Sequence, residues 1–312
     1  MTPPNNTMNE PAVTSTATPS PNAPGALRAM LERGEFIVAP GVYEMMTAKV
    51  ADRMGFPALY MTGYGVSASH LGLADAGLVG FTDMVGRAAT IARGITRPLI
   101  ADADTGFGGL INVRHTVRGY EAAGVQAIQL EDQEMPKKCG HTPNRRVVPL
   151  VDAVRRVEVA VDSRRSKDFL IIARTDARTA YGLDEALQRA RAFAKAGADI
   201  VFVESPESED EFKQIGAELA DCGAWLIANM VPSGRSPELT AAQLKELGFS
   251  LAIWPAAIMA ATCAAADNAL SYLAKHGTTR GSQVPTYSMD QLHDLMGFAE
   301  VWAFEKRYAQ TE

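Results

Sequence analysis

The chain has 312 residues, of which 47% are hydrophobic and 21% charged, and its formal net charge is -6. This is an ordinary globular composition, without the basic surface expected of a protein that binds nucleic acid or anionic membranes. Three cysteines are too few for a disulfide framework, and no apolar run resembles a membrane span or a signal-peptide core. We therefore expect a cytoplasmic protein that acts on small molecules.

The first 24 residues differ in composition from the rest of the chain. They contain six prolines among many Thr, Ser and Asn residues, and they have no Lys or Arg. Such a segment cannot bury enough apolar surface to order itself, so we expect residues 1–24 to form a disordered tail. Residues 25–312 are then a single domain, and this length is within the range of one α/β barrel.

Eight short apolar runs alternate with longer amphipathic segments from residue 36 onward, a pattern that predicts βαβ units and a parallel sheet. The runs cover residues 36–42, 58–63, 98–104, 127–132, 170–176, 200–205, 225–230 and 251–255. Between them, residues 183–198 show apolar positions at helical spacing and end at Gly197. Eight strand–helix units predict a (β/α)8 TIM barrel, with its active site at the C-terminal ends of the strands. A doubly wound fold has little support, because no G-x-G-x-x-G follows the first strand.

Polar side chains end six consecutive predicted strands. Each of them alone could cap the following helix or form an Asx turn. Their recurrence on neighbouring strands favours one shared site at the barrel mouth. They are Thr62 with Gly63, Asp102 with Asp104, Glu131 with Asp132, Arg174 with Asp176, Glu204, and Asn229.

The segment ADADTGFGG carries two carboxylates, Asp102 and Asp104, that are two residues apart. On a strand this spacing points both side chains to the same side, here the barrel mouth. Two like charges held together favour either a raised pKa or a bound cation, and Glu131 on the next strand favours the cation. Oxygen ligands of this kind suit Mg²⁺, with Mn²⁺ also possible, whereas a purely structural acid cluster is the alternative.

The segment that follows the fourth strand contains Cys139 between Lys137, Lys138 and His141. Nearby positive charge lowers the pKa of a thiol, which would make Cys139 a better nucleophile or proton carrier. The alternative is a solvated basic loop with an incidental cysteine. Zinc has little support, because Cys139 and His141 are only two residues apart and no second ligand pair follows.

The other residues of chemical interest are simpler to interpret. Cys222 and Cys263 lie in apolar surroundings and are expected to be small core residues. Arg174 emerges from a strongly apolar strand, where a guanidinium is costly unless it meets an anion. That anion could be Asp176 or Glu204 in a structural pair, or it could be a carboxylate or enolate oxygen of the substrate.

Five motifs resemble those of the isocitrate lyase / phosphoenolpyruvate mutase superfamily. They are YMTGYGVSASHLGLADAG, ADADTGFGG, LEDQEMPKKCGH, ARTDA and FVES, and the resemblance extends from about residue 27 to residue 308. TGYGVSAS and PKKCGH favour the 2-alkylmalate lyase branch, which contains petal death protein-like members, over the more distant methylisocitrate lyase branch. The resemblance implies a Mg²⁺-dependent lyase, with Mn²⁺ a possible substitute, that cleaves a 2-hydroxy dicarboxylate of the 2-alkylmalate or 2-methylisocitrate type.

The same resemblance assigns roles to the matching residues. Asp102 is implied to ligate the metal directly, with Asp75, Asp104 and Glu131 holding metal-bound waters. Cys139 is implied to be the catalytic acid on a mobile loop. The remaining site residues implied by the motifs are, as catalytic groups, Arg174, Glu204, Tyr60 and His141, and, as substrate contacts, Thr62, Gly63, Tyr64, Lys137, Gly140 and Asn229.

The resemblance also implies a homotetramer in which C-terminal helices swap between paired subunits, and residues 289–309 form a suitable amphipathic segment. Other activities of the scaffold are alternatives: oxaloacetate hydrolysis or decarboxylation, then a phosphonomutase. An idle binding barrel that keeps the metal site is a further alternative, which the intact acid cluster and cysteine loop disfavour.

Two segments depart from the family pattern. Relatives carry a sequence like N-M-x-E-G-G-x-T-P after strand seven, whereas this chain has NMVPSGRSP, so Pro232 replaces a Glu and Arg235 adds a cation. This loop leaves the choice of substrate open. Ala257 stands where several relatives have Ser or Thr, a position associated with the oxaloacetate-hydrolysing branch. Its methyl group weakens the case for a hydrolase.

Overall fold

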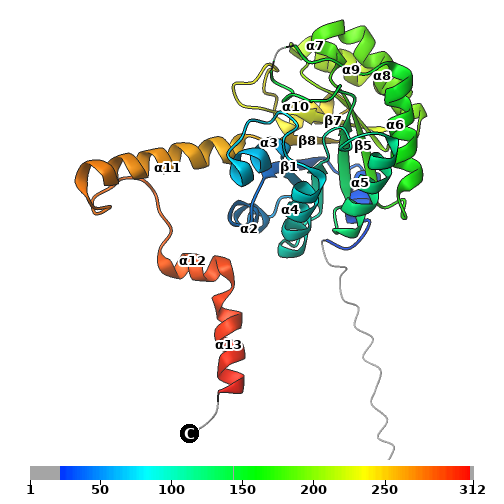
Figure 1. Ribbon diagram of the computed structural model, residues 1–312. Coiled ribbons are helices and arrows are strands. Elements are labelled where there is room, and N and C mark those ends of the chain that lie inside the picture. Colours follow the sequence, from blue (N-terminus) through cyan, green and yellow to red (C-terminus); the bar gives the residue numbers. More distant parts are fainter. Residues whose placement is uncertain (1–21, 143, 310–312) are drawn as a thin grey trace, which may run out of the picture.

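The protein is a closed barrel of eight parallel strands in chain order, surrounded by helices (Figure 1). This computed structural model describes residues 22–142 and 144–309. The predicted TIM barrel is therefore confirmed. The strands are β1 (Ile37–Val42), β2 (Leu59–Met61), β3 (Leu99–Asp102), β4 (Ala127–Glu131), β5 (Leu170–Thr175), β6 (Ile200–Val203), β7 (Trp225–Asn229) and β8 (Leu251–Trp254).

Most helices lie outside the barrel, between consecutive strands (Figure 1). The described helices before β8 are α1 (Ala26–Glu32), α2 (Met45–Arg53), α3 (Gly63–Val66), the π-helix η1 (Ser67–Leu71), α4 (Phe81–Gly94), α5 (Leu110–Ala122), α6 (Leu150–Ser163), α7 (Ala177–Tyr181), α8 (Leu183–Lys195), α9 (Glu209–Leu219) and α10 (Ala241–Glu246). The helix predicted from residues 183–198 is confirmed as α8, which buries Ala186, Leu187, Ala190 and Phe193 against the strands.

The strands are apolar because both of their faces are covered. Side chains such as Ile100, Ile172 and Phe202 fill the interior, while two other clusters lie between strands and helices. Helix α1 belongs to the interior cluster through Leu27 and Leu31, both of them buried. Helix α1 and the interior side chains therefore fill the barrel at the N-terminal ends of the strands. The C-terminal ends of the strands remain available for a site.

Ordered contacts begin before the predicted domain boundary at residue 25. Gln126 donates hydrogen bonds to the Asn22 side chain at 3.0 Å and to the Ala23 carbonyl at 2.9 Å. The same Gln126 accepts from the Leu27 backbone N–H at 2.9 Å. The rest of the predicted tail, residues 1–21, lies outside the described residues.

The C-terminal helices leave the barrel as an arm: α11 (Ala257–His276), α12 (Met289–Met296) and α13 (Phe298–Tyr308) (Figure 1). None of these helices has a buried residue. The prediction that Cys263 is a core residue is wrong for the single chain, because α11 projects away from the barrel and Cys263 is exposed. Cys222 is half-buried and packs against the core. No helix in the described part of the chain is both long and apolar enough to cross a membrane.

Candidate active site

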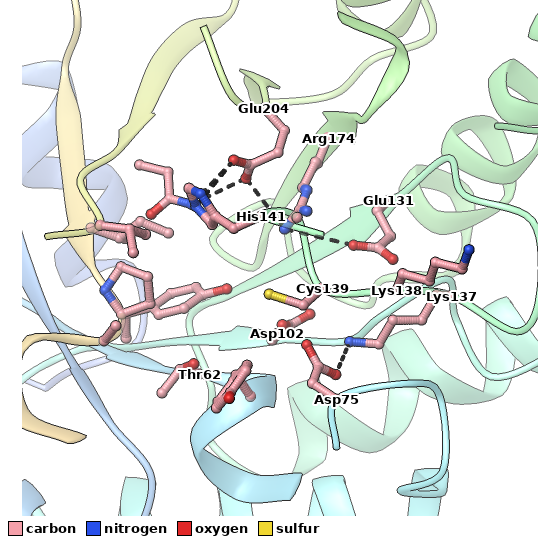
Figure 2. A pocket seen from close by; sticks show the side chains of 18 of the residues that line it. Thr62, Asp75, Asp102, Glu131, Lys137, Lys138, Cys139, His141, Arg174 and Glu204 are labelled. Carbon is pink, nitrogen blue, oxygen red and sulfur yellow. Dashed lines mark hydrogen bonds and ion pairs between the residues drawn. The ribbon is translucent and has the colours of Figure 1, made fainter. Parts of the chain in front are cut away.

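A cavity of about 270 Å³ opens at the C-terminal ends of the strands. Figure 2 shows its charged side chains gathered around Cys139, whose sulfur points into the middle of the space. Of the fifteen predicted site residues, thirteen line this cavity, and the other two, Gly63 and Asp104, contact Asp102 at its edge. The lining residues are Tyr60, Thr62, Tyr64, Asp75, Asp102, Glu131, Lys137, Lys138, Cys139, Gly140, His141, Arg174, Glu204, Asn229, Val231, Ile253, Pro255, Ala256 and Met259.

Asp102 ends β3, and two backbone N–H groups hold its carboxylate. Gly63 donates to Oδ2 at 3.3 Å and Asp104 donates to Oδ1 at 3.0 Å. A Cβ at position 63 would lie only 2.6 Å from Asp102 Oδ2, so a glycine is required for this approach. The prediction that Asp102 and Asp104 share one strand is wrong. Residue 102 is the last of β3, and Asp104 follows in a turn with a φ of 47°, where its N–H can reach back to Asp102.

Lys137 neutralises part of the acid cluster. Its ammonium lies 2.6 Å from Asp104 Oδ1 and also pairs with Asp75, and its side chain is only 3% exposed. Burial raises the pKa of Asp104 to about 7, with the Asp102 and Asp75 charges adding to this effect and Lys137 opposing it. Burial works against the charge of Lys137, yet the surrounding carboxylates raise its pKa well above the ordinary value. The ammonium is therefore charged, and it occupies the space between two of the four predicted metal residues.

The remaining carboxylates leave acceptor capacity for a cation. Glu131 is buried, and its Oε1 has no hydrogen-bond partner. Burial raises the pKa of Glu131, so its ionised form needs a positive neighbour. Among the described residues, no three Asp, Glu, His or Cys side chains already converge as a metal centre. The donor set therefore fits an ion such as Mg²⁺ that keeps several waters and takes few direct carboxylates, and it does not fit a closed cage.

Arg174, near the end of β5, is held along one edge of its guanidinium. Its Nε and Nη2 each donate to the Asp176 carboxylate at 2.9 Å. Its Nη1 lies 3.6 Å from Glu131 Oε2 and 3.5 Å from Glu204 Oε2, longer than good hydrogen bonds. The structural pair with Asp176 is therefore confirmed, and Nη1 lies between Glu131 and Glu204, two other residues that line the cavity. The contact of Arg174 with a substrate oxygen stays a prediction.

The loop between β4 and α6 brings Cys139 into the cavity, half-buried. Burial raises the pKa of its thiol, so the lowered pKa expected from the neighbouring lysines is wrong. The structure explains the difference: Lys137 is committed to Asp75 and Asp104, and Lys138 Nζ donates to the Asn144 carbonyl at 3.0 Å. A thiol that stays protonated is suited to donating a proton rather than to nucleophilic attack.

The same loop packs against the ends of β6 and β7. A Cβ at Gly140 would lie 2.4 Å from Arg174 Nη2, so this close packing requires glycine. His141 Nε2 lies 3.7 Å from Glu204 Oε1, and the Arg235 backbone N–H donates to His141 Nδ1 at 3.2 Å. Burial lowers the pKa of His141, so the neutral form of the imidazole ring is favoured at neutral pH. Asn229 Nδ2 donates to Glu204 Oε2 at 3.1 Å and fixes that carboxylate.

Strand β2 and the residues that follow it form another side of the cavity. Tyr60 is buried and donates its hydroxyl to Gln129 Oε1 at 3.2 Å, and burial raises its pKa well above the ordinary value. Thr62 caps α3 by accepting from the Gly65 N–H at 3.4 Å. Tyr64 is 44% exposed and stands at the rim. Thr62 therefore both caps a helix and lines the site.

The chain matches a known protein family. The model of the phosphoenolpyruvate phosphomutase family matches residues 27–274. A 2,3-dimethylmalate lyase of Eubacterium barkeri is 47% identical over 288 residues, which cover 92% of this chain and 99% of that protein. A 2-methylisocitrate lyase of Aeropyrum pernix is 40% identical, covering 91% and 90%. The petal death protein of Dianthus caryophyllus is 35% identical, covering 99% and 96%.

The chain belongs to the phosphoenolpyruvate mutase/isocitrate lyase superfamily. The predicted superfamily and enzyme class are confirmed, with lyases among the matched relatives. A solved oxaloacetate acetylhydrolase in complex with 3,3-difluorooxalacetate has a TM-score of 0.85 at 37% identity, covering 92% of this chain and 97% of that one. A phosphonopyruvate hydrolase solved with oxalate and Mg²⁺ has a TM-score of 0.80 at 29% identity, covering 91% and 98%.

Two features of this superfamily member escaped the sequence analysis. The first is an apolar side of the cavity formed by Val231, Ile253, Pro255, Ala256 and Met259. The signal available was that predicted strand eight, unlike the six before it, ends in apolar residues. Ala256 lines the cavity and Ala257 does not, so this turn presents no hydroxyl to the site.

The second feature is a buried charge junction at Asp176, outside the cavity. Its Oδ1 accepts from Arg174 and, at 2.7 Å, from Nη1 of Arg145, whose side chain is 0% exposed. Arg145 also contacts the Thr179 hydroxyl. The junction ties the end of the cysteine loop to the strand that carries Arg174. Nothing in the sequence distinguishes the buried Arg145 from its exposed neighbour Arg146, because both lie in a stretch rich in basic residues.

Replacing Arg145 by Met should lower the free energy of unfolding by about 3 kcal/mol, because it removes one partner of a buried ion pair. Arg146→Met is the matched control: this side chain is 76% exposed in its pair with Glu134, and the same substitution should change stability by less than about 0.5 kcal/mol. Urea denaturation of the two variants measures both quantities. Equal stability of the two variants would contradict the structural role of Arg145.

Proposed function

We propose that the chain is a Mg²⁺-dependent carbon–carbon lyase that cleaves a 2-hydroxy dicarboxylate into an α-keto acid and a carboxylate. One observation carries the proposal: a single small cavity contains buried carboxylates with spare acceptor capacity, one outward guanidinium nitrogen, and a thiol held protonated. The matched relatives include lyases of this kind.

Asp102 and Glu131, together with Asp75 and Asp104, would hold the metal, which when bound supplies Lewis-acid stabilisation of substrate oxygens. Arg174 Nη1 would bind a carboxylate or the developing oxyanion, because Asp176 has already fixed the other edge of the guanidinium. Glu204, Asn229 and His141 form a hydrogen-bonded wall that orients the second carboxyl group. Burial of these groups excludes water and strengthens each interaction.

In the reaction the substrate loses its 2-hydroxyl proton, and the bond between C2 and C3 breaks. C2 becomes the keto carbon of the α-keto acid, and the bonding electrons remain on C3 as a carboxylate enolate. Cys139 would donate its thiol proton to C3, which completes the second product, and the thiolate would then regain one proton from solvent, in place of the proton that the 2-hydroxyl releases. This role agrees with a raised thiol pKa, since a group that donates a proton must hold one beforehand.

Substitution of Cys139 by Ala should reduce kcat roughly 100-fold or more, the usual size of a general-acid contribution, without loss of fold. Formation of pyruvate from 2,3-dimethylmalate measures the rate, and circular dichroism checks the fold. Cys222→Ala, a half-buried cysteine outside the cavity, is the control and should retain the wild-type rate. A wild-type rate in the Cys139 variant would contradict the role of Cys139 as the proton donor.

Metal removal provides a separate test. Dialysis against a chelator should reduce turnover at least about 100-fold, and added Mg²⁺ or Mn²⁺ should restore it, because oxygen ligands of this type bind both ions. Glu131→Gln should raise the Mg²⁺ concentration needed for half-maximal activity, and it should weaken Mg²⁺ binding measured by calorimetry. Full activity in excess chelator would contradict the metal requirement.

Oxaloacetate hydrolysis is the second candidate, because a solved oxaloacetate acetylhydrolase is similar over almost the whole chain. The absence of a hydroxyl at both Ala256 and Ala257 argues against it. Oxalate and acetate as the main products from oxaloacetate would favour this candidate, whereas pyruvate from alkylmalates favours the lyase.

We also propose that the arm docks on a second copy of the chain, in a homotetramer. Its helices expose large apolar side chains that a lone chain leaves in water, among them Leu270, Val301, Trp302 and Phe304. Light scattering after size exclusion should give four chains for the full protein. Removal of residues 278–312 should give a smaller assembly, and an unchanged tetramer would contradict this role of the arm.

A further inference from the structure

We propose that the apolar side of the cavity selects substrates in which the substituent on C3 is an alkyl group and not a carboxylate-bearing one. This inference rests on the lyase function proposed above and specifies its substrate class. Relatives with both kinds of name, a 2,3-dimethylmalate lyase and a 2-methylisocitrate lyase, match about nine-tenths of the chain. Coverage of the chain does not separate the two names, and the shape and charge of this cavity give evidence that is independent of the motifs favouring the 2-alkylmalate branch.

The closed barrel separates the cavity into two sides. Strands β3 to β6, the cysteine loop and the segment after η1 that carries Asp75 contribute its acids, lysines and Arg174, whereas β8 lies across the barrel from β4. Figure 2 shows Glu131, Arg174 and Glu204 on one side of the space, with Asp75 paired with Lys137 below them. The β7–β8 side consists of Val231, Ile253, Pro255, Ala256 and Met259, and Ile253 is only 1% exposed. A substrate whose carboxylates bind on the charged side would turn its C3 substituent toward the apolar β7–β8 side.

The cations that line the cavity are already committed to other groups. Lys137 pairs with Asp75 and Asp104, and Lys138 Nζ donates to a loop carbonyl. Arg174 Nη1, which lies 3.6 Å from Glu131 Oε2 and 3.5 Å from Glu204 Oε2, would serve the two substrate carboxyl groups together with the metal. His141 accepts from the Arg235 backbone N–H and lies 3.7 Å from Glu204 Oε1. Among the described residues, no Lys, Arg or His extends from the β7–β8 side into the lining.

Arg235 is a nearby cation that could bind a third carboxylate. It follows β7, and its backbone N–H donates to His141. However, its side chain is exposed and does not line the cavity. A third carboxylate against Val231, Ile253 and Met259 would therefore lose its water without gaining a partner, which is strongly unfavourable. A methyl or ethyl group in the same place gains from the contact.

Two probes isolate this difference. 2,3-Dimethylmalate and 2-methylisocitrate share the hydroxyl, methyl and carboxylate on C2 and differ only on C3, which carries methyl in one and carboxymethyl in the other. In both, the C2–C3 bond breaks and C2 becomes the keto carbon of pyruvate. C3 takes up one proton and leaves as propionate or succinate. A lactate dehydrogenase-coupled assay therefore measures both substrates through the same product.

Met259 is the residue on this side best suited to test the inference, because it lies in the first turn of α11 and is only partly buried. Met259→Lys places an ammonium on the apolar wall, and its long stem can follow the path of the methionine. Met259→Leu is the matched control that keeps the wall apolar. Arg235→Gln tests the competing cation without changing the backbone contact to His141.

For the wild-type enzyme we expect kcat/KM for 2,3-dimethylmalate to exceed that for 2-methylisocitrate by roughly 100-fold, because of the unpaired charge. Met259→Lys should move this ratio toward 2-methylisocitrate by roughly tenfold or more, while Met259→Leu and Arg235→Gln should leave it within about threefold.

A wild-type preference for 2-methylisocitrate, or loss of its turnover in Arg235→Gln, would overturn the inference and leave the lyase function intact. Pyruvate from neither probe would instead overturn the proposed function and the inference with it. If Met259→Lys fails to fold, the wild-type ratio and the Arg235→Gln variant still decide the question.

Discussion

The geometry of the site depends on one buried interaction, the pairing of Arg174 with Asp176. Burial alone would raise the pKa of Asp176, but the Arg174 and Arg145 charges lower it below the ordinary value, so the carboxylate stays ionised. Its two oxygens take up Nε and Nη2 of Arg174, and only Nη1 is left for the cavity. A guanidinium fixed along one edge loses little entropy when it meets a substrate oxygen, which is the preorganisation that catalysis requires.

The same carboxylate also connects two parts of the site that are distant in sequence. Arg145 closes the cysteine loop onto Asp176, while the start of that loop is held by Lys137 in the acid cluster. Cys139 lies between these two anchors. Because the cations of both anchors face carboxylates, burial has a larger effect on the thiol than positive charge has, and the pKa of Cys139 rises. The network that positions the cysteine thus also keeps it in the acid form.

The barrel and most of the site were predictable from sequence because they follow from local patterns. The eight apolar runs match the eight strands within two residues at every end, and polar residues at strand ends share one mouth by topology alone. What sequence could not supply depends on partners far apart in the chain. The turn at Asp104, the commitment of Lys137 to Asp75, and the burial of Arg145 but not Arg146 are all set by tertiary contacts. For this reason the sequence wrongly predicted that the lysines beside Cys139 lower the pKa of its thiol.

The apolar wall and the arm are parts of one element. Helix α11 begins with the turn that carries Met259 into the cavity and then continues outward as the first helix of the arm. A helix transmits a displacement along its axis, because its backbone hydrogen bonds make it stiff over this length. Contacts that hold the arm in an assembly would therefore also hold Met259 against the substrate. In this architecture the apolar side of the cavity and the arm share one helix, whereas the charged side is built on β3 to β6, the cysteine loop and the segment after η1 that carries Asp75.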